Sequence, residues 1–541
     1  MNNNLIALIV AIPFVAGILT TVTRGHIRTQ RALGGLALIA LLGVNVLLML
    51  GLRGTGEHSL WTSIAGGWPA PFGIALVYDQ LSGLLMGVAS IVAIGCFIYA
   101  CGTLDRRIER GWFHPLFHLL IMGVNFSFLT GDLFNLFVSF EIMLMASYAM
   151  LCLAGTRPQI AQAYKYILIN LVGSTIFVLG AGLIYGVVGT LNIADLARIA
   201  ASDNPPPPVF QAIGVLLLFV FALKAAVFPL WFWLPDTYHT LPTPIVAMFS
   251  ALLSKVGVYA ILRLFPSIFA SPQLQQDSIV PVILSIGAGA TMIIAILGAL
   301  STRQMRRALA MLLIAHVGYL IFGISVGINA GAPNAYSGVL FYMTQEMILM
   351  AALFLATGLI ESITSTDDTT QFSGLATRAP GIAALCFVIA ASFIGFPPLS
   401  GFYGKAMLVR EGFATGHAPL AIATLFTAAM TLFVMIRLWA GAFWGTPKGP
   451  GVDLPEGAKW GATPVPAQAV VGTAFLAGAS VAYALAAGPM MDIATDATAQ
   501  LNEPRTYVTA VLGDEAWPMH RDPPAPVLAQ ADQDSHSEGV R

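Results

Sequence analysis

Long apolar runs separated by short polar connections fill most of the sequence. A run of about 20 apolar residues is long enough to cross a bilayer as an α-helix. We place fourteen such runs at residues 4–22, 29–52, 74–102, 112–130, 132–154, 160–188, 208–236, 242–266, 280–300, 305–327, 335–361, 381–410, 417–445 and 465–487. The pattern predicts an all-α polytopic membrane protein with about fourteen transmembrane helices.

The composition supports this class. Among 541 residues, 57% are hydrophobic and 9% are charged, whereas a soluble domain carries about 25% charged residues. Disordered chains are poor in apolar residues, and no basic surface is available for nucleic acid. The N-terminus lacks a basic segment and a small-residue cleavage site, so we expect residues 4–22 to remain as the first span.

Basic residues collect in every second connection. They are Arg24, Arg28, Arg31, Arg106, Arg107, Arg110, Arg157, Lys165, Arg303, Arg306, Arg307, Arg378, Lys448 and Lys459. The positive-inside rule places these connections in the cytoplasm and both termini outside. Residues 488–541, which carry an excess of acidic side chains, are then an extracytoplasmic tail whose end, from about Asp522, is expected to be disordered.

Two of the runs, 208–236 and 381–410, are long, carry a lysine and contain prolines that interrupt them. These prolines are Pro229 and Pro235 in the first run, and Pro397 and Pro398 in the second. Proline removes a backbone donor and frees a carbonyl one turn earlier. Inside a membrane such a break is tolerated only against protein or a hydrated cavity.

A weak internal repeat accompanies the breaks. Residues 261–265 read ILRLF and residues 435–439 read MIRLW, each near the end of a span that follows a broken one. The two segments lie five spans apart, so they run in opposite directions, and we expect inverted repeats of five helices. The predicted segments are 1–111 (three helices), 112–267 (first repeat), 268–446 (second, inverted repeat), 447–487 (last helix) and 488–541 (tail).

Six titratable groups lie deep inside the predicted spans. They are Glu141, Lys224, Lys255, His316, Glu346 and Lys405. A charge at the centre of a bilayer costs about 2.5–3.5 kcal/mol, so it persists where it faces protein or water and has a function. Acids and bases that are buried side by side exchange protons readily. The array therefore predicts a membrane-embedded proton relay, and it is a poor metal site.

Structural interpretations stand beside the functional one. Glu141 could belong to a structural ion pair, Lys224 could extend its ammonium group to the membrane surface, and His316 could be a hydrogen-bonded core residue. Polar groups near span ends have ordinary roles: capping and turn formation for Asp132, Asp236 and His239, an interfacial position for Asp79, and extension toward the surface for Arg263 and Arg437.

No motif in the sequence indicates a cofactor. We find no Walker motif, no dinucleotide-binding fingerprint and no cysteine spacing for haem or iron–sulfur clusters. The four cysteines, Cys96, Cys101, Cys152 and Cys386, lie in apolar runs without a Cys-x-x-Cys pair, so we read them as core residues. We expect no cofactor, no metal and no enzymatic activity.

Several motifs resemble the D subunits of multisubunit Mrp (Mnh, Pha) monovalent cation/proton antiporters. They are residues 129–138 (LTGDLFNLFV) leading to Glu141, residues 233–239 (WLPDTYH) followed by 242–244 (PTP), and residues 395–402 (GFPPLSGF) followed by Lys405. The last two are shared with the antiporter-like subunits of respiratory complex I. Residues 66–68 (GGW), 71–74 (PFGI) and 507–513 (YVTAVLG) are similar to Mrp D subunits in particular.

The resemblance implies a fold of fourteen helices with inverted five-helix repeats and a hetero-oligomeric complex with other Mrp subunits in the bacterial cytoplasmic membrane. It implies exchange of protons against Na⁺ or another monovalent cation, with Glu141 acting on Lys224 and protons moving through Lys255, His316 and Lys405. One departure is Met350, where relatives often carry a lysine, while Glu346 lies one turn earlier. An alternative is the proton-pumping arm of a redox enzyme, such as complex I or a membrane-bound hydrogenase.

Overall fold

The computed structural model describes residues 4–53, 60–202, 206–271, 274, 278–446, 448, 465–502 and 504–516. Twelve helices within these residues are long and apolar enough to cross a membrane. They are α1 (Asn4–Val22), α2 (Ile27–Arg53), α3 (Gln80–Thr103), α5 (His114–Leu129) with its preceding turns, α6 (Leu133–Leu151), α7 (Arg157–Val188), α11 (Thr243–Leu264) with η3 (Phe265–Phe269), α12 (Val280–Ser301), α13 (Met305–Ala330), α14 (Pro333–Thr364), α18 (Ala418–Phe443) and α19 (Ala467–Leu485).

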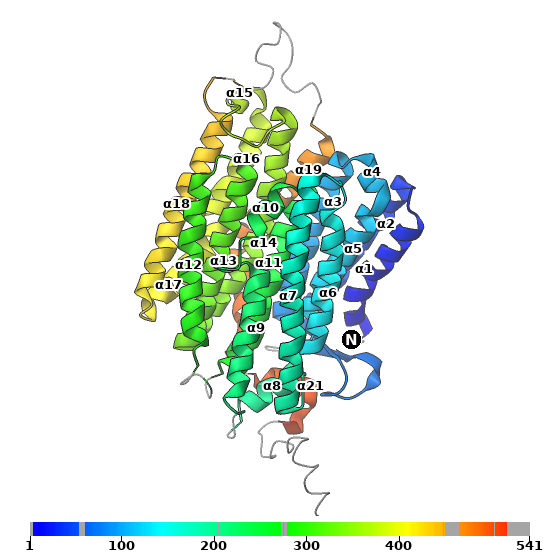
Figure 1. Cartoon of the computed structure of the whole chain (residues 1–541), viewed down its shortest axis with the longest axis vertical. Helices are drawn as coiled ribbons and strands as arrows, with labels where there is room; N and C mark the ends of the chain where they lie inside the picture. The colour runs from blue at the N-terminus through cyan, green and yellow to red at the C-terminus, as the bar shows by residue number, and fades with distance from the viewer. Residues whose placement is uncertain are drawn as a thin grey trace, which may run out of the picture.

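Two further pairs of shorter helices are interrupted where the sequence predicted breaks. They are α9 (Val209–Ala225) with α10 (Leu234–His239), and α16 (Pro380–Ile394) with α17 (Ser400–Ala414). All these helices lie roughly parallel in one bundle (Figure 1). The predicted all-α membrane class is therefore confirmed, while the count of fourteen crossings and the inverted repeats stay predictions.

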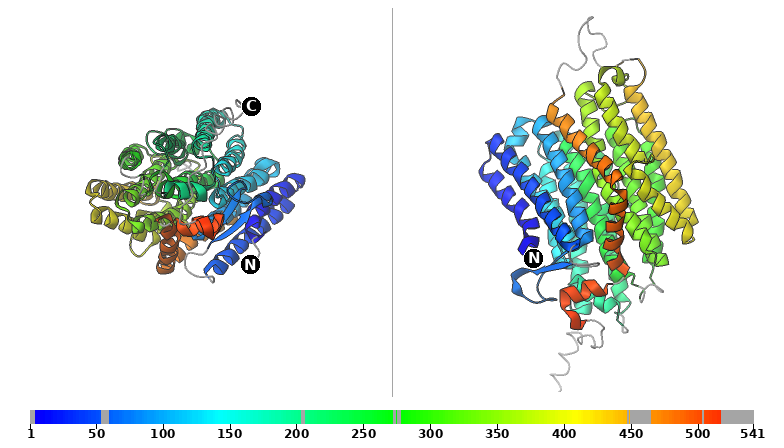
Figure 2. Two further views of the ribbon diagram at one scale, coloured as in Figure 1. Left: turned by 90° about the horizontal axis from the view of Figure 1, so that it is seen from below. Right: turned by 180° about the vertical axis from the view of Figure 1, so that it is seen from behind.

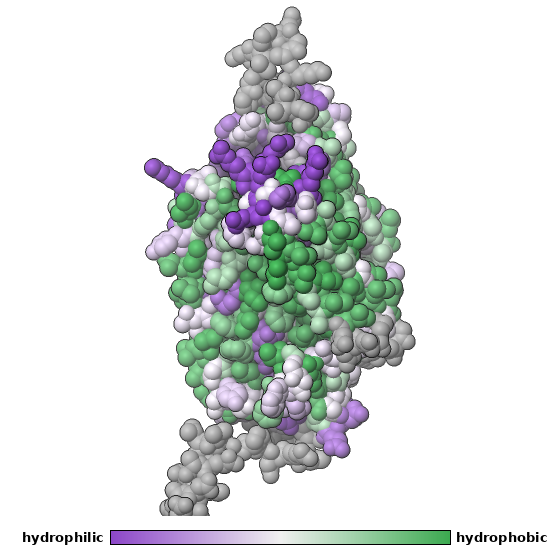
Figure 3. All heavy atoms as spheres, turned by 90° about the vertical axis from the view of Figure 1, so that its right-hand side faces the viewer, coloured by the Kyte–Doolittle hydropathy of each residue, from purple (hydrophilic) through white to green (hydrophobic). Residues whose placement is uncertain are grey.

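Polarity divides the bundle into a long apolar part and a polar end. Figure 3 shows a green apolar surface below a group of purple side chains. The short helices α4 (Arg106–Ile108) and α15 (Leu375–Arg378), which carry predicted cytoplasmic arginines, lie at the upper end in Figure 1. The helices alternate in direction, so the other basic connections share this end, which we call the basic end. Lys459 lies outside the described residues.

A small hairpin and two short helices cover the opposite end. Strands β1 (Trp61–Ile64) and β2 (Ala75–Tyr78) pair antiparallel, with Trp61 opposite Tyr78 and with η1 (Ala65–Gly67) in their connection. The helices are α8 (Ile193–Ala200) and α21 (Arg505–Leu512), followed by η5 (Asp514–Ala516) (Figure 1). The apolar run predicted from residue 74 thus begins as a strand, because Asp79 caps α3 by accepting a hydrogen bond from the Ser82 backbone N–H at 2.8 Å.

The C-terminal segment differs from the expected tail. Residues 487–502 form helix α20, which continues α19 down the bundle (Figure 2) and packs against α14 and α3. The buried residues Ile493, Ala494, Ala497 and Leu501 recur at helical spacing and form its packed face. The sequence interpretation gave weight to the acidic residues and missed this apolar stripe. The end of the tail, from residue 517, lies outside the described residues.

Removing α20 should weaken the bundle. A chain that ends after Ala486 loses the buried face of α20 and the Thr498–Ser337 hydroxyl contact of 2.8 Å, so we expect poor accumulation and a lower apparent Tm. A chain that ends after Ala516 keeps both and is the matched control. Fluorescence-detected size-exclusion chromatography after heating measures the difference, and equal stability of the two chains would contradict a structural role for α20.

Candidate functional site

The interruption between α16 and α17 places Lys405 against two free backbone carbonyls. In a continuous helix the carbonyls of Phe393 and Ile394 would accept from the N–H groups of residues 397 and 398, but both positions are proline and carry no N–H. Lys405 Nζ donates to both carbonyls instead, each at 3.0 Å. The break thus creates an acceptor pair that holds a buried ammonium group.

Aromatic rings complete the environment of Lys405. Its Nζ lies 5.7 Å from the ring centroids of Tyr319 and Phe393 and 6.0 Å from that of Tyr342. Ring faces attract a cation, most strongly where water is excluded, and the side chain of Lys405 is buried. Lys405 therefore does not extend to the membrane surface.

His316 lies beside Lys405 on α13. Its ring stacks on Phe393 at 4.2 Å between centroids, and its Nδ1 is 2.8 Å from the hydroxyl of Tyr342. Its Nε2 is buried and has no hydrogen-bond partner among the described residues. Phe393 thus touches His316 through its ring and Lys405 through its carbonyl, which couples the two groups at the end of α16.

Lys255 and Glu346 form a fully buried ion pair between α11 and α14. Lys255 Nζ lies 2.9 Å from Glu346 Oε1, and both side chains are 0% exposed. Glu346 also interacts electrostatically with Lys405, so its charge acts on both lysines. Met350, one turn further along α14, is buried and apolar, so the charged group that α14 offers at this depth is the carboxylate of Glu346 rather than a lysine.

Glu141 and Lys224 are linked through α7 rather than in direct contact. Ser174 Oγ donates to Glu141 Oε1, and Lys224 Nζ donates to Asn170 Oδ1 at 3.0 Å. Asn170 and Ser174 are four residues apart, so they lie on one face of α7. Within the described residues Glu141 and Lys224 form no direct ion pair with each other, although their charges interact. The polar face of α7 is the bridge between them.

The interruption after Lys224 is built differently from the one before Lys405. Ala226 has a left-handed backbone with φ of 62° and ends α9, and the Phe228 N–H donates to Thr291 Oγ1 of α12 at 2.9 Å. Pro229 lies inside this break, between α9 and α10. Pro235 lies in the first turn of α10, where proline is well tolerated, so it begins a helix rather than interrupting one.

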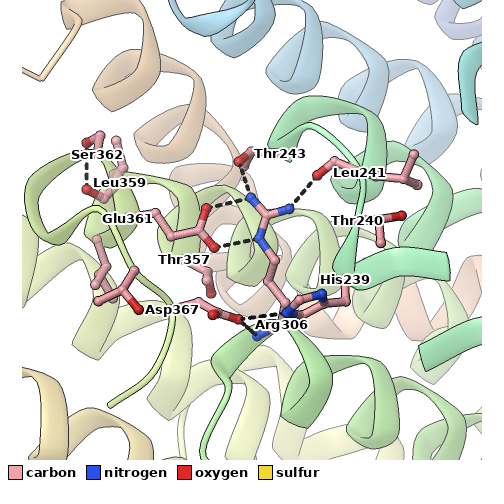
Figure 4. A network of polar contacts seen from close by, with 12 residues as sticks. His239, Thr240, Leu241, Thr243, Arg306, Thr357, Leu359, Glu361, Ser362 and Asp367 are labelled. Carbon is pink, nitrogen blue, oxygen red and sulfur yellow. Dashed lines mark hydrogen bonds and ion pairs between the residues drawn. The ribbon is translucent and has the colours of Figure 1, made fainter. Parts of the chain in front are cut away.

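A second polar cluster joins the two halves at the basic end (Figure 4). Arg306 of α13 donates to both carboxylate oxygens of Glu361 at 2.5 Å, to Thr243 Oγ1 at 2.9 Å and to the carbonyl of Leu241. His239 at the end of α10 lies 3.8 Å from Asp367; burial lowers the pKa of His239, while the Asp367 carboxylate opposes that shift. From the sequence, Arg306 served only to orient the chain in the membrane.

Two arginines that were expected to extend toward the surface instead bind other groups of the protein, Arg263 buried and Arg437 partly buried. Arg263 lies 2.6 Å from Asp79 and donates to the Tyr259 hydroxyl at 3.1 Å, with Tyr507 of α21 over it. Asp79 is therefore buried and not interfacial. Arg437 donates to the carbonyls of Ala299, Leu300 and Thr302, where it satisfies the C-terminal end of α12. The expected cap at Asp132 is present, since it accepts from the Asn135 N–H at 2.8 Å.

Comparison with known proteins agrees with this architecture. Residues 130–431 match the family described as NADH:quinone oxidoreductase/Mrp antiporter, transmembrane. The D subunit of the Na⁺/H⁺ antiporter of Alkalihalophilus pseudofirmus is 36% identical over 94% of this chain and 99% of the relative. In the solved Mrp complex from Dietzia, one chain is 29% identical, with a TM-score of 0.83 over 94% of this chain and 99% of that chain.

An archaeal respiratory complex has a chain of the same shape. In the membrane-bound sulfane sulfur reductase, the matching chain is 26% identical, with a TM-score of 0.81 over 94% of this chain and 99% of that chain. The fold and the buried array thus define a polytopic membrane subunit of the antiporter class that Mrp complexes and respiratory complexes share. Within this class, the chain belongs to the family of Na⁺/H⁺ antiporter D subunits.

Replacing Lys405 should destabilise the interrupted helix. Lys405→Met leaves two buried carbonyls without a donor, and each such group costs about 1–3 kcal/mol. We expect a lower apparent Tm of the purified complex in detergent. Lys448→Met, at an exposed lysine, is the matched control, and an unchanged Tm for Lys405→Met would contradict the assignment of these carbonyls to Lys405.

The Arg306–Glu361 pair should show strong coupling. Removing one member of a buried ion pair leaves its partner uncompensated, at a cost of about 3–5 kcal/mol. The side chains are 12% and 21% exposed, so we expect the lower end of that range for Arg306→Gln or Glu361→Gln. The double variant should lose less than the sum of the two single losses. A double-mutant cycle on thermal stability measures this, and additive losses would show that the pair contributes nothing.

Proposed function

We propose that this chain is the proton-translocating subunit of a multisubunit Na⁺ (monovalent cation)/H⁺ antiporter. The protons move through Glu141, Lys224, Lys255, Glu346, His316 and Lys405, and the other subunits of the complex take part in cation movement. The observation that carries the proposal is the chain of buried charges that reaches both interrupted helices. Lys255–Glu346 lies in the middle of it, and Lys405 is held by the carbonyls that one break frees.

Glu141 is the controlling group of the first half. Its carboxylate acts on the ammonium group of Lys224 across Ser174 and Asn170. A change of charge or position at Glu141 therefore changes whether Lys224 keeps its proton. Because the link runs through two neutral side chains, a small rotation of α7 or α9 is enough to strengthen or break it.

Glu346 is the corresponding group at the centre. It pairs with Lys255 and acts on Lys405. A proton that arrives at Lys255 draws the Glu346 carboxylate toward Lys255 and weakens its attraction for Lys405, and a proton that leaves Lys255 has the opposite effect. His316 lies beside Lys405 and offers a second proton acceptor, since no donor or acceptor among the described residues occupies its Nε2. We infer a relay that passes from α9 through α11 and α14 to α13 and α17.

An antiporter is favoured over a redox enzyme by the level of similarity. Identity is 36% to the D subunit of a Na⁺/H⁺ antiporter and 26% to the chain of the sulfane sulfur reductase. We further propose that the basic end faces the cytoplasm and that residues 112–267 and 268–446 are the two inverted repeats. Identification of the subunits that copurify with the chain separates the two complexes.

Exchange should fail when the first acid–base pair is removed. In inverted vesicles with the full complex, Na⁺-dependent pH change should fall at least tenfold (roughly 1.4 kcal/mol of barrier or more) in Glu141→Gln and in Lys224→Ala. Asp492→Asn and Lys165→Ala replace exposed residues of the same types and should exchange like the wild type.

Assembly is the necessary control for this measurement. Each variant is compared at equal amounts of complete complex, measured by native electrophoresis. Wild-type exchange in fully assembled Glu141→Gln and Lys224→Ala complexes would overturn the proposed function.

A further inference from the structure

A second line of buried polar groups runs along α5, away from the array described above. His114, His118 and Asn125 are all 0% exposed and lie at spacings of four and seven residues, so they share one face of the helix. His118 faces α2 and α3: a Cβ at Gly34 of α2 would lie 2.9 Å from its Nε2, and its ring is 6.3 Å from that of Phe97 on α3.

Within the described part of the chain, these three side chains are poorly paired. Both ring nitrogens of His118 and both amide atoms of Asn125 are buried without a hydrogen-bond partner there, and His114 has only the 3.4 Å contact of its Nε2 with Glu109. An unpaired buried polar group costs roughly 1–3 kcal/mol, and native proteins satisfy such groups with ordered water. His114 and His118 lie in successive turns and Asn125 lies two turns further along the same face, so ordered water along this face of α5 would satisfy all three.

The line begins at a carboxylate near the basic end. The turn η2 (Glu109–Phe113) is a π-helix, whose i to i+5 spacing brings Glu109 onto the face of His114. Glu109 Oε1 lies 3.4 Å from His114 Nε2 and 2.6 Å from Arg31 Nε. The Arg31 side chain is 36% exposed while Glu109 is 1% exposed, so the ion pair connects the polar end of the bundle to the buried histidines.

The walls of the line are apolar. The rings of Phe97, Phe113 and Phe117 lie 5.3–5.8 Å from the histidine they flank most closely. Among the described residues, Glu109 of η2 is the charged group that contacts His114; it is held by Arg31 of α2, which also donates to the carbonyl of Cys101 on α3. Glu109 is the acid of this set, so it is the group that can exchange protons with His114.

We propose that Glu109, His114, His118 and Asn125 form a hydrated proton path from the basic end to the middle of the bundle, separate from the Glu141–Lys405 array. Each imidazole takes a proton at one ring nitrogen and releases one from the other, so a proton passes from Glu109 to His114 and on to His118 without net change of charge, and rotation of each ring then restores its starting tautomer. Asn125 continues the file by orienting water through its amide.

This path lies on different elements from the central array. It uses α2, α3, η2 and α5, whereas the array uses α6, α7, α9, α11, α13, α14 and α17. The path would give protons a separate entrance on the N-terminal side of the chain. Its role in exchange rests on the proposed function, but its hydration does not, so the two are tested separately.

Hydration is tested by cysteine labelling in the assembled complex. In a background where Cys96, Cys101, Cys152 and Cys386 are replaced by serine or alanine, His118→Cys and Asn125→Cys should react with 2-aminoethyl methanethiosulfonate at least tenfold faster than Leu120→Cys. Leu120 is equally buried on the opposite face of α5. Reaction of both positions no faster than Leu120→Cys would overturn the path.

Proton transfer is tested by comparing three histidine variants. His118→Gln keeps hydrogen bonding but cannot carry a proton, so its Na⁺-dependent exchange should fall at least fivefold, to the level of His118→Leu. His26→Gln, at an exposed histidine of the same end, should exchange like the wild type. If His118→Gln also exchanges like the wild type while Glu141→Gln and Lys224→Ala fail, the path is refuted and the proposed function stands.

Discussion

Burying a charge where water is scarce is the constraint on which the structure depends. Each deep ammonium group has partners that replace its water: a carboxylate for Lys255, an amide for Lys224 and two carbonyls with aromatic rings for Lys405. Supplying those partners shapes the backbone, because carbonyls become free only where a helix is interrupted. At Lys405 the break and the charge therefore stabilise each other, and the surrounding helices hold both in place.

The two halves solve this problem in different ways. In the first half, the acid and the base are separated by the polar face of α7, and the break after Lys224 is held by Thr291 from α12. In the second half, Lys405 binds the break directly and shares Glu346 with Lys255. The first half thus links acid and base through neutral side chains, where the second half has a direct ion pair.

Much of the fold followed from the sequence, since apolar runs, prolines and isolated charges are local signals. The partners were harder to foresee because they come from distant helices. Asn170 and Ser174 stood as a polar pair four residues apart in an apolar run, a signal that could have been read. Asp79 and Arg263 lie in different spans and pair only in three dimensions. The helix at 487–502 was hidden because its acidic residues and its apolar stripe share the same turns.

The proline pair before Lys405 has a consequence for how such sequences can change over generations. Any other residue at position 397 or 398 would restore an N–H that competes with the lysine for the carbonyls of Phe393 and Ile394. Loss of the lysine alone would leave those carbonyls bare. Pro397, Pro398 and Lys405 therefore constrain one another during evolution. Replacing one of them before the others passes through a less stable protein, which has either a bare carbonyl or a competing N–H.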